Sequence, residues 1–279
     1  MTLARLDNEV FFKKAFTDRE VFVAFVRDIV GIEFEPDKIE TEKAFQPRLG
    51  NIAFKYDIFA EDSKRRIIVE IQKVEYDHNF DRFLHYHLQG ITEQQRGSED
   101  YSVQRTVYTI VVMTAPYRIH EKTGEIYRDE VLVSSLNPKN LRGTERKIFN
   151  HELIFLNPNY RGDDTPANYR DWLDLIYESI HHADQPRLNT ANEGIRRAAE
   201  IISFDKISPE EWELAKIEAS KQKVLKLTFE EGLEEGLEKG QEAKAFEVAR
   251  AAIQKGFDDA TIAELTGLTA AQIEALRTA

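Results

Sequence analysis

The chain has 279 residues, a net charge of −12 and no cysteine. A chain of this length can bury a sizeable core, and we expect one main domain with an appendage. The lack of cysteine excludes disulfides, thiolate zinc sites and cysteine nucleophiles, so a metal ion would need oxygen or imidazole ligands. No apolar run approaches the roughly 20 residues that cross a bilayer, and the N-terminus has no apolar signal segment. We therefore expect a cytoplasmic protein without membrane contact.

The first half of the chain predicts a helical start followed by strands. Residues 8–30 carry apolar side chains at helical spacing, and Gly31 is a plausible helix stop. Segments 39–45, 52–60 and 65–74 are rich in β-branched and aromatic residues, and a polar turn at 61–64 joins the last two. A helix over roughly 80–96 and a strand over 107–115 follow. Further strands near 126–134 and 148–156 and a helix ending near 182 complete an α/β or α+β core.

A long helix is predicted after a connector at 183–207. It begins at Ser208 and Pro209, where Glu211 completes a capping pattern, and it contains the repeat EGLEEGLEKG. The three glycines of the repeat, at 232, 236 and 240, each cost about 1 kcal/mol relative to alanine in a helix. Close approach of another helix would compensate for this cost, so we expect a homo-oligomer formed through this helix. The alternative is an exposed acidic helix without a partner.

The last segment predicts two short helices separated by Gly267. Asp258 can cap the first, and Thr269 with Gln272 forms a capping box for the second. This arrangement is like a helix-turn-helix, but its second helix carries little positive charge, so we favour a packing or oligomerisation appendage over DNA reading. The expected division is 1–182 for the main domain, 183–254 for the connector and long helix, and 255–279 for the tail.

The stretch RRIIVEIQK at 65–73 places Glu70 and Gln72 inside an otherwise apolar strand. Both point to one face because side chains alternate along a strand, and a buried carboxylate needs a partner. If the turn is centred between Asp62 and Ser63, Asp57 lies opposite Ile68 and diagonal to Glu70, where the two carboxylates could share a divalent ion. Alternatively, Glu70 lies on an exposed edge strand or pairs with Lys55, which the same register puts opposite it.

Several motifs resemble one known family. Residues 9–16, EVFFKKAF, resemble an acidic-x-x-Phe-Lys-x-x-Phe signature of the recombination-promoting nuclease and putative transposase family, part of the PD-(D/E)XK superfamily. Asp57 resembles the strand aspartate of that family, and Val69 to Gln72 resemble its Val-Glu-x-Gln element. The resemblance continues through Arg82, Tyr86, Gly97, Tyr101, the strand ending VYTIVV, the Glu-Gly repeat and the tail.

This resemblance implies a restriction-endonuclease-like fold, with a central mixed sheet flanked by helices and a helical C-terminal extension. It also implies a metal-dependent DNA endonuclease linked to recombination or mobile elements, using Mg²⁺ or Mn²⁺. Asp57 and Glu70 would hold the ion, and Glu9 could add a carboxylate. The rival interpretations are a non-catalytic oligomeric assembly protein that keeps the fold, and a ribonuclease.

The chain departs from the superfamily pattern at Gln72, which stands where the superfamily has lysine and supplies no charge. Lys55 shares a face with Asp57, so we expect Lys55 to orient the attacking water or to stabilise developing negative charge. DNA contacts are expected from three arginines after the site, although solvated surface arginines are the alternative. These are Arg82, Arg96 and Arg105.

Overall fold

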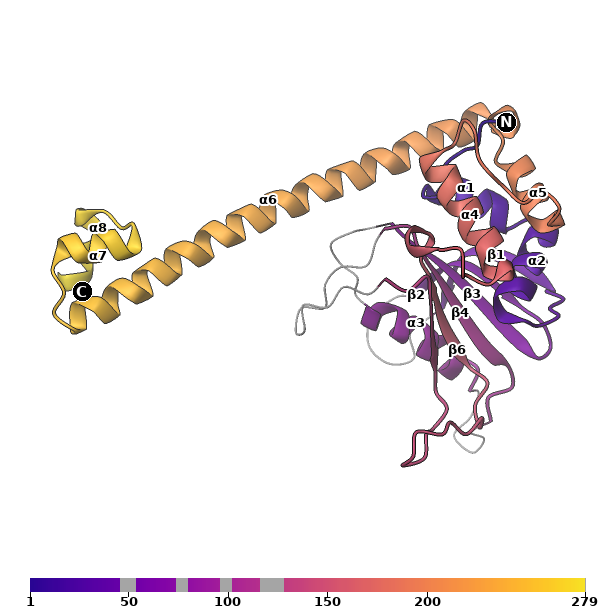
Figure 1. Ribbon diagram of the computed structural model, residues 1–279, viewed down its shortest axis with the longest axis horizontal. Helices are drawn as coiled ribbons and strands as arrows, with labels where there is room; N and C mark the ends of the chain where they lie inside the picture. The colour runs from indigo at the N-terminus through magenta and orange to yellow at the C-terminus, as the bar shows by residue number, and fades with distance from the viewer. Residues whose placement is uncertain (46–53, 74–79, 96–101, 116–127, 279) are drawn as a thin grey trace. The chain divides into compact units, whose positions relative to one another are not determined.

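A six-stranded mixed sheet forms the centre of the computed structural model, which describes residues 1–45, 54–73, 80–95, 102–115 and 128–278 (Figure 1). The strand order is β1-β2-β3-β4-β6-β5. β3, β4 and β6 run parallel, whereas the other neighbours are antiparallel. This confirms the expected fold class. The strands are β1 (Lys38–Phe45), β2 (Phe54–Glu61), β3 (Arg65–Gln72), β4 (Thr106–Met113), β5 (Val131–Ser135) and β6 (Glu152–Leu156).

Helices cover both faces of the sheet. The larger core packs one face against α1 (Glu9–Phe16), α2 (Arg19–Val30), α4 (Ala167–His181) and α5 (Glu193–Ile201). α3 (Phe80–Thr92) covers the other face through Phe83 and through the close approach of Gly90 to Ile68. Short 3₁₀ turns occupy Pro158–Tyr160 and Phe204–Lys206. The central strands are therefore covered on both sides, which explains their continuous apolar sequences.

The segment 8–30 forms two helices where one was expected. Asn8 caps α1 through a bond from the Val10 amide, and the helix ends at Thr17. Asp18 then accepts bonds from the Glu20 and Val21 amides and begins α2, which ends at Gly31 in the left-handed conformation. The helical periodicity continues across this break, and for that reason the pattern alone did not reveal it.

The β2–β3 turn sets a register that differs from the expected one. The Asp62 amide donates to the Arg65 carbonyl at 2.9 Å, and Asp62 Oδ1 accepts from the Lys64 and Arg65 amides. The centre of the turn therefore lies between Ser63 and Lys64, and Phe59 pairs with Ile68. The prediction that Asp57 lies opposite Ile68 was wrong, because the Asp62 side chain moves the turn one residue along the chain.

The packing divides the chain into Met1–Glu218 and Ala219–Ala279. Residues of the expected connector, together with the start of α6 (Pro209–Gln254), belong to the first core; among them are Ile195, Ile202, Ile207 and Ala215. The second unit contains the rest of α6 with α7 (Asp259–Thr266) and α8 (Ala270–Thr278), which share a small core around Ile262 and Ile273. No helix in the described part of the chain is long and apolar enough to span a bilayer.

Candidate active site

The candidate site lies where β2 and β3 part. Their pairing runs from Glu61 and Arg66 to Ile58 and Val69. Beyond it, the Asp57 amide donates to Glu70 Oε1 at 3.2 Å, and the Ile71 amide donates to Asp57 Oδ2 at 3.0 Å. Each carboxylate thus accepts a hydrogen bond from a backbone amide of the neighbouring strand. These bonds hold both side chains in place and partly compensate for the burial of Glu70, which is only 3% exposed.

Glu42 completes an acidic cluster that the sequence did not reveal. The β1–β2 pairing is interrupted at Glu42, which has φ 57° and is the only non-glycine residue with positive φ in the described part of the chain. Carboxylate oxygens of Glu9, Glu42 and Asp57 all lie within 4.8 Å of one another. A left-handed backbone costs about 1–3 kcal/mol, and such strain concentrates at functional sites. The strand-like sequence KIETEKAF gave no sign of this conformation.

Lys13 places its ammonium among these carboxylates. Its Nζ forms ion pairs with Glu9 and Glu42 and lies 3.9 Å from Asp57 Oδ1, while the side chain is only 15% exposed. Lys13 follows Glu9 by one helical turn, a spacing that brings the two side chains together and could have identified it. Its neighbour Lys14 pairs with Glu211 at 2.6 Å. Only one of the two adjacent lysines therefore belongs to the acidic cluster.

The pKa values of both strand carboxyls are raised. Burial, followed by the charge of Asp57, holds the pKa of Glu70 well above its usual range. Burial also raises the pKa of Asp57, although the hydrogen bond from Ile71 and the charge of Lys13 oppose the rise. A cation or a proton beside these groups is consequently stabilised.

Gln72 and Lys55 each contact a residue beside the strand carboxylates. Gln72 is buried and its Oε1 accepts a 2.6 Å bond from Arg82 Nη2. Lys55 forms an ion pair with Glu42, and its side chain is 61% exposed. The expected alternative pairing of Lys55 with Glu70 was wrong, because the register puts Glu70 next to Asp57.

The three predicted DNA-contacting arginines are placed in different ways. Arg82 lies beside the site, bonded to Gln72 and stacked over Phe83 at 4.7 Å. Arg105 lies at the opposite end of the central strands, just before the Thr106 that pairs with Arg65, and donates to the Asp62 carbonyl at 2.7 Å. Arg96 lies outside the described residues.

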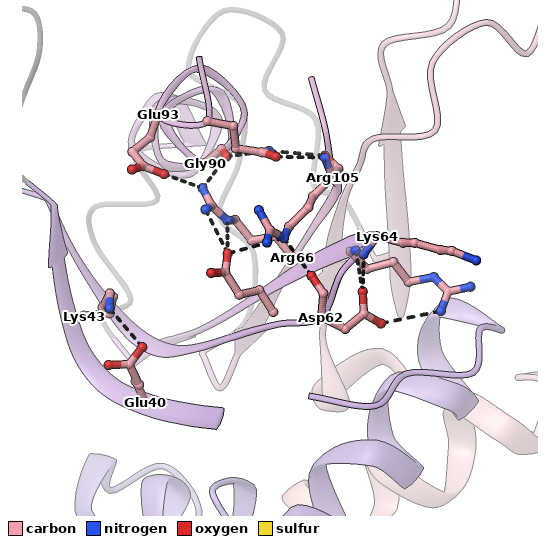
Figure 2. A network of polar contacts seen from close by, with 11 residues as sticks. Glu40, Lys43, Asp62, Lys64, Arg66, Gly90, Glu93 and Arg105 are labelled. Carbon is pink, nitrogen blue, oxygen red and sulfur yellow. Dashed lines mark hydrogen bonds and ion pairs between the residues drawn. The ribbon is translucent and has the colours of Figure 1, made fainter. Parts of the chain in front are cut away.

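A buried arginine network holds α3 on the sheet (Figure 2). Arg66 pairs with Glu61 at 2.9 Å and with Glu93 at 2.8 Å, and it donates to the Gly90 carbonyl at 2.9 Å. Since α3 carries Arg82, this network fixes the element that presents a cation to Gln72. Arg105 joins the same network through Glu61, whose Oε2 lies 3.9 Å from Arg105 Nε, and it also donates to the Asp62 carbonyl (Figure 2), so its guanidinium is engaged within the fold.

Two family models match the chain. Residues 21–226 match the model described as PD-(D/E)XK nuclease family transposase, and residues 242–278 match Rpn/YhgA-like nuclease family, C-terminal HTH domain. No curated protein and no solved structure matches the chain. Glu9 and Lys13 precede the first matched range, whereas Glu42, Asp57, Glu70 and Gln72 lie inside it. Because that range covers most of the chain, the protein belongs to the PD-(D/E)XK nuclease family transposases and ends in a helix-turn-helix domain of the Rpn/YhgA-like type.

Proposed function

We propose that this protein is a divalent-metal-dependent endonuclease that hydrolyses DNA phosphodiester bonds in recombination or mobile-element biology. The observation that carries the proposal is the convergence of Glu9, Glu42 and Asp57 where β2 and β3 part, in a chain of a nuclease family. Carboxylate oxygens are the ligands that Mg²⁺ and Mn²⁺ prefer, so these residues fit a hard cation. Asp57 and Glu70, the expected ligand pair, are in contact through the Asp57 amide.

In this proposal Glu9, Glu42 and Asp57 would hold Mg²⁺ or Mn²⁺, with Glu70 adjoining them. A bound ion of this kind polarises a phosphoryl oxygen and lowers the pKa of water. Lys13 supplies the positive charge that Gln72 lacks, because its ammonium lies at the cluster. Gln72 instead orients Arg82 for contact with phosphate. We assign Lys55, which shares Glu42 with Lys13, to holding that carboxylate.

We also propose that the chain self-associates through α6. Leu225, Leu233 and Leu237 are more than half exposed, and a Cβ at Gly232, Gly236 or Gly240 would meet no atom within 4 Å. The leucines are spaced by eight and four residues and the glycines by four, so they form two adjacent rows on one side of the helix, here called the α6 stripe. A second copy of the same helix could pack closely on it. In the assembly-protein alternative, this contact is the whole function.

Plasmid cleavage tests the catalytic proposal. Supercoiled DNA is incubated at low salt with Mg²⁺, Mn²⁺, Ca²⁺ or EDTA, using wild type, Asp57→Asn, Glu42→Gln and a control, Glu40→Gln. Glu40 is also on β1 but pairs with Lys43 at 2.9 Å, away from the cluster. We expect Mg²⁺- or Mn²⁺-dependent nicking that only the two cluster variants lose.

Two other outcomes would select the alternatives. A folded wild type that nicks no DNA with any metal, yet forms oligomers, would support the assembly protein. Faster metal-dependent cleavage of an RNA of matched sequence would support a ribonuclease. Equal loss of nicking in Glu40→Gln would remove the assignment to the cluster.

A further inference from the structure

A basic hairpin projects from the sheet at the edge formed by β5 and β6 (Figure 1). This basic arm, residues 136–150, connects the two strands. It carries Lys139, Arg142, Arg146 and Lys147 against a single acid, Glu145, in a chain whose net charge is −12. Residues 138–150 are all exposed. The arm is therefore a local concentration of positive charge on an acidic protein.

Two asparagine side chains give the basic arm a defined shape. Asn137 Oδ1 accepts bonds from the Ile148 and Phe149 amides, each at 2.8 Å. Asn140 Oδ1 accepts bonds from the Arg142 and Thr144 amides at 2.9 and 3.0 Å. Gly143, with φ 82°, makes the turn at the tip. The cations are therefore presented by an organised hairpin.

The charges of the arm are not neutralised within the fold. Glu145 accepts a bond from Ser135 Oγ at 3.0 Å. In the described part of the chain, no carboxylate lies within 4.0 Å of the charged nitrogens of Lys139, Arg142 or Arg146. By contrast, Arg19, Lys38 and Arg196 are similarly exposed but each forms an ion pair with a glutamate.

Apolar side chains accompany the cations. Leu141 at the tip is fully exposed, and Ile148 is 63% exposed. Cations that contact phosphates next to an apolar residue that can enter a groove are a combination that suits duplex DNA.

We propose that the basic arm is a second contact site for duplex DNA, through phosphates and through Leu141. This inference rests on the proposed function and extends it. Glu152 at the base of the arm pairs with Tyr108, which pairs with Ile67, so the arm extends away from the strand ends that carry Glu70. Phe155 is level with Glu70, and 12 residues separate it from Gly143 at the tip, so at about 3.3 Å per extended residue the tip lies up to about 40 Å from the carboxylates. The arm therefore sets DNA affinity and takes no part in bond cleavage.

Binding and cleavage measured separately test this role. The variant Lys139→Gln/Arg142→Gln/Arg146→Gln is compared with a control of equal charge change, Arg19→Gln/Lys38→Gln/Arg196→Gln. Fluorescence anisotropy with a labelled 30-base-pair duplex in EDTA gives Kd over a series of salt concentrations. We expect at least tenfold weaker binding for the arm variant alone, and a salt slope smaller by roughly 2–3, since each phosphate contact contributes about 0.9.

Single-turnover cleavage at saturating protein completes the test. The arm variant should then cleave at the wild-type rate, and Leu141→Ala should weaken binding without changing the salt slope. Four results would each overturn the inference. Two concern the variants: DNA binding that is weakened equally in both triple variants, or that is unchanged in the arm variant. The others are that the wild type binds no DNA, or that arm-dependent binding is found only with an RNA hairpin. Arm-dependent DNA binding without wild-type cleavage would instead overturn the proposed function alone.

Discussion

Replacing Lys13 tests whether its positive charge contributes to DNA cleavage or only balances the carboxylates of the candidate site. It lies among three carboxylates, whereas the adjacent Lys14 pairs with Glu211. We expect Lys13→Met to lower single-turnover DNA cleavage by about 10²-fold, the usual cost of losing one stabilising donor. Mn²⁺ affinity, measured by calorimetry, should rise, because a cation that repels the metal ion has been removed.

Lys14→Met is the matched control for this prediction. It changes the same residue type on the same helix and should leave both the cleavage rate and Mn²⁺ affinity near wild type. Wild-type cleavage by Lys13→Met would show that Lys13 only balances charge within the fold.

His87 should make the protein less stable in acid. It is buried, its Nδ1 lies 3.0 Å from Thr109 Oγ1, and burial together with His151 lowers its pKa to about 4. In the unfolded chain its pKa is about 6.5, so the unfolded state binds more protons as the pH falls from 6.5 to 4. The stability lost over this window is on the order of 3 kcal/mol.

Urea unfolding at pH 7, 6, 5 and 4 measures this loss. His87→Leu should be less stable at pH 7 because Thr109 loses its partner, but its free energy of unfolding should fall less between pH 6.5 and 4. The same pH dependence in His87→Leu as in wild type would assign the acid sensitivity to other groups.

The residue types of the site could be predicted only in part. Glu70 and Asp57 were recognisable because carboxylates in apolar strands are costly without a partner. Glu42 was not, because its role depends on an irregular backbone between two regular strand pairs. Gln72 was identified as a departure from the superfamily, but its bond to Arg82 comes from a helix whose register the sequence does not reveal.

At the scale of elements, α5 depends on a glycine where it crosses the core. A Cβ at Gly194 would lie 2.7 Å from Ala24 Cβ and 3.1 Å from Trp172 Cζ2. Neither neighbour can move without displacing α2 or α4, so Gly194→Ala should lower the free energy of unfolding by about 1–3 kcal/mol.

Gly232→Ala is the contrasting change, because a Cβ there meets no atom within 4 Å. In the dissociated chain, where no second copy packs on α6, it should add up to about 1 kcal/mol of local helix stability. Thermal unfolding and amide exchange of the two variants measure both effects. A Gly194→Ala variant as stable as wild type would show that α5 can shift outward.

The positions of helices and strands could be predicted from the sequence more accurately than the register in which the strands pair. Strand-forming segments and the capping box at Ser208 and Glu211 were confirmed, the latter by reciprocal bonds of 2.8 and 3.2 Å. The β2–β3 register was wrong because one side chain, Asp62, decides where the turn lies. Such a local hydrogen bond leaves no trace in hydrophobic periodicity.

At the scale of the whole molecule, self-association through α6 predicts that the mass of the particle in solution falls when two leucines of this helix are replaced. Leu233→Lys/Leu237→Lys should convert an oligomer at micromolar concentration to a monomer, because charge would enter an apolar contact. Val133→Lys, an equally exposed position on β5, is the control. Light scattering coupled to gel filtration gives the mass. A wild-type monomer at all concentrations would leave the α6 stripe without a partner.

Two backbone amides that donate to the carboxylates of Glu70 and Asp57 can report on the state of the site. The amides of Asp57 and Ile71 donate to carboxylates rather than to carbonyls. Any event that draws those oxygens away, such as protonation or the arrival of a cation, must release or weaken one of these bonds. Nitrogen-15 chemical shifts at 57 and 71 should therefore follow occupancy of the site directly, in a protein that is cutting nothing.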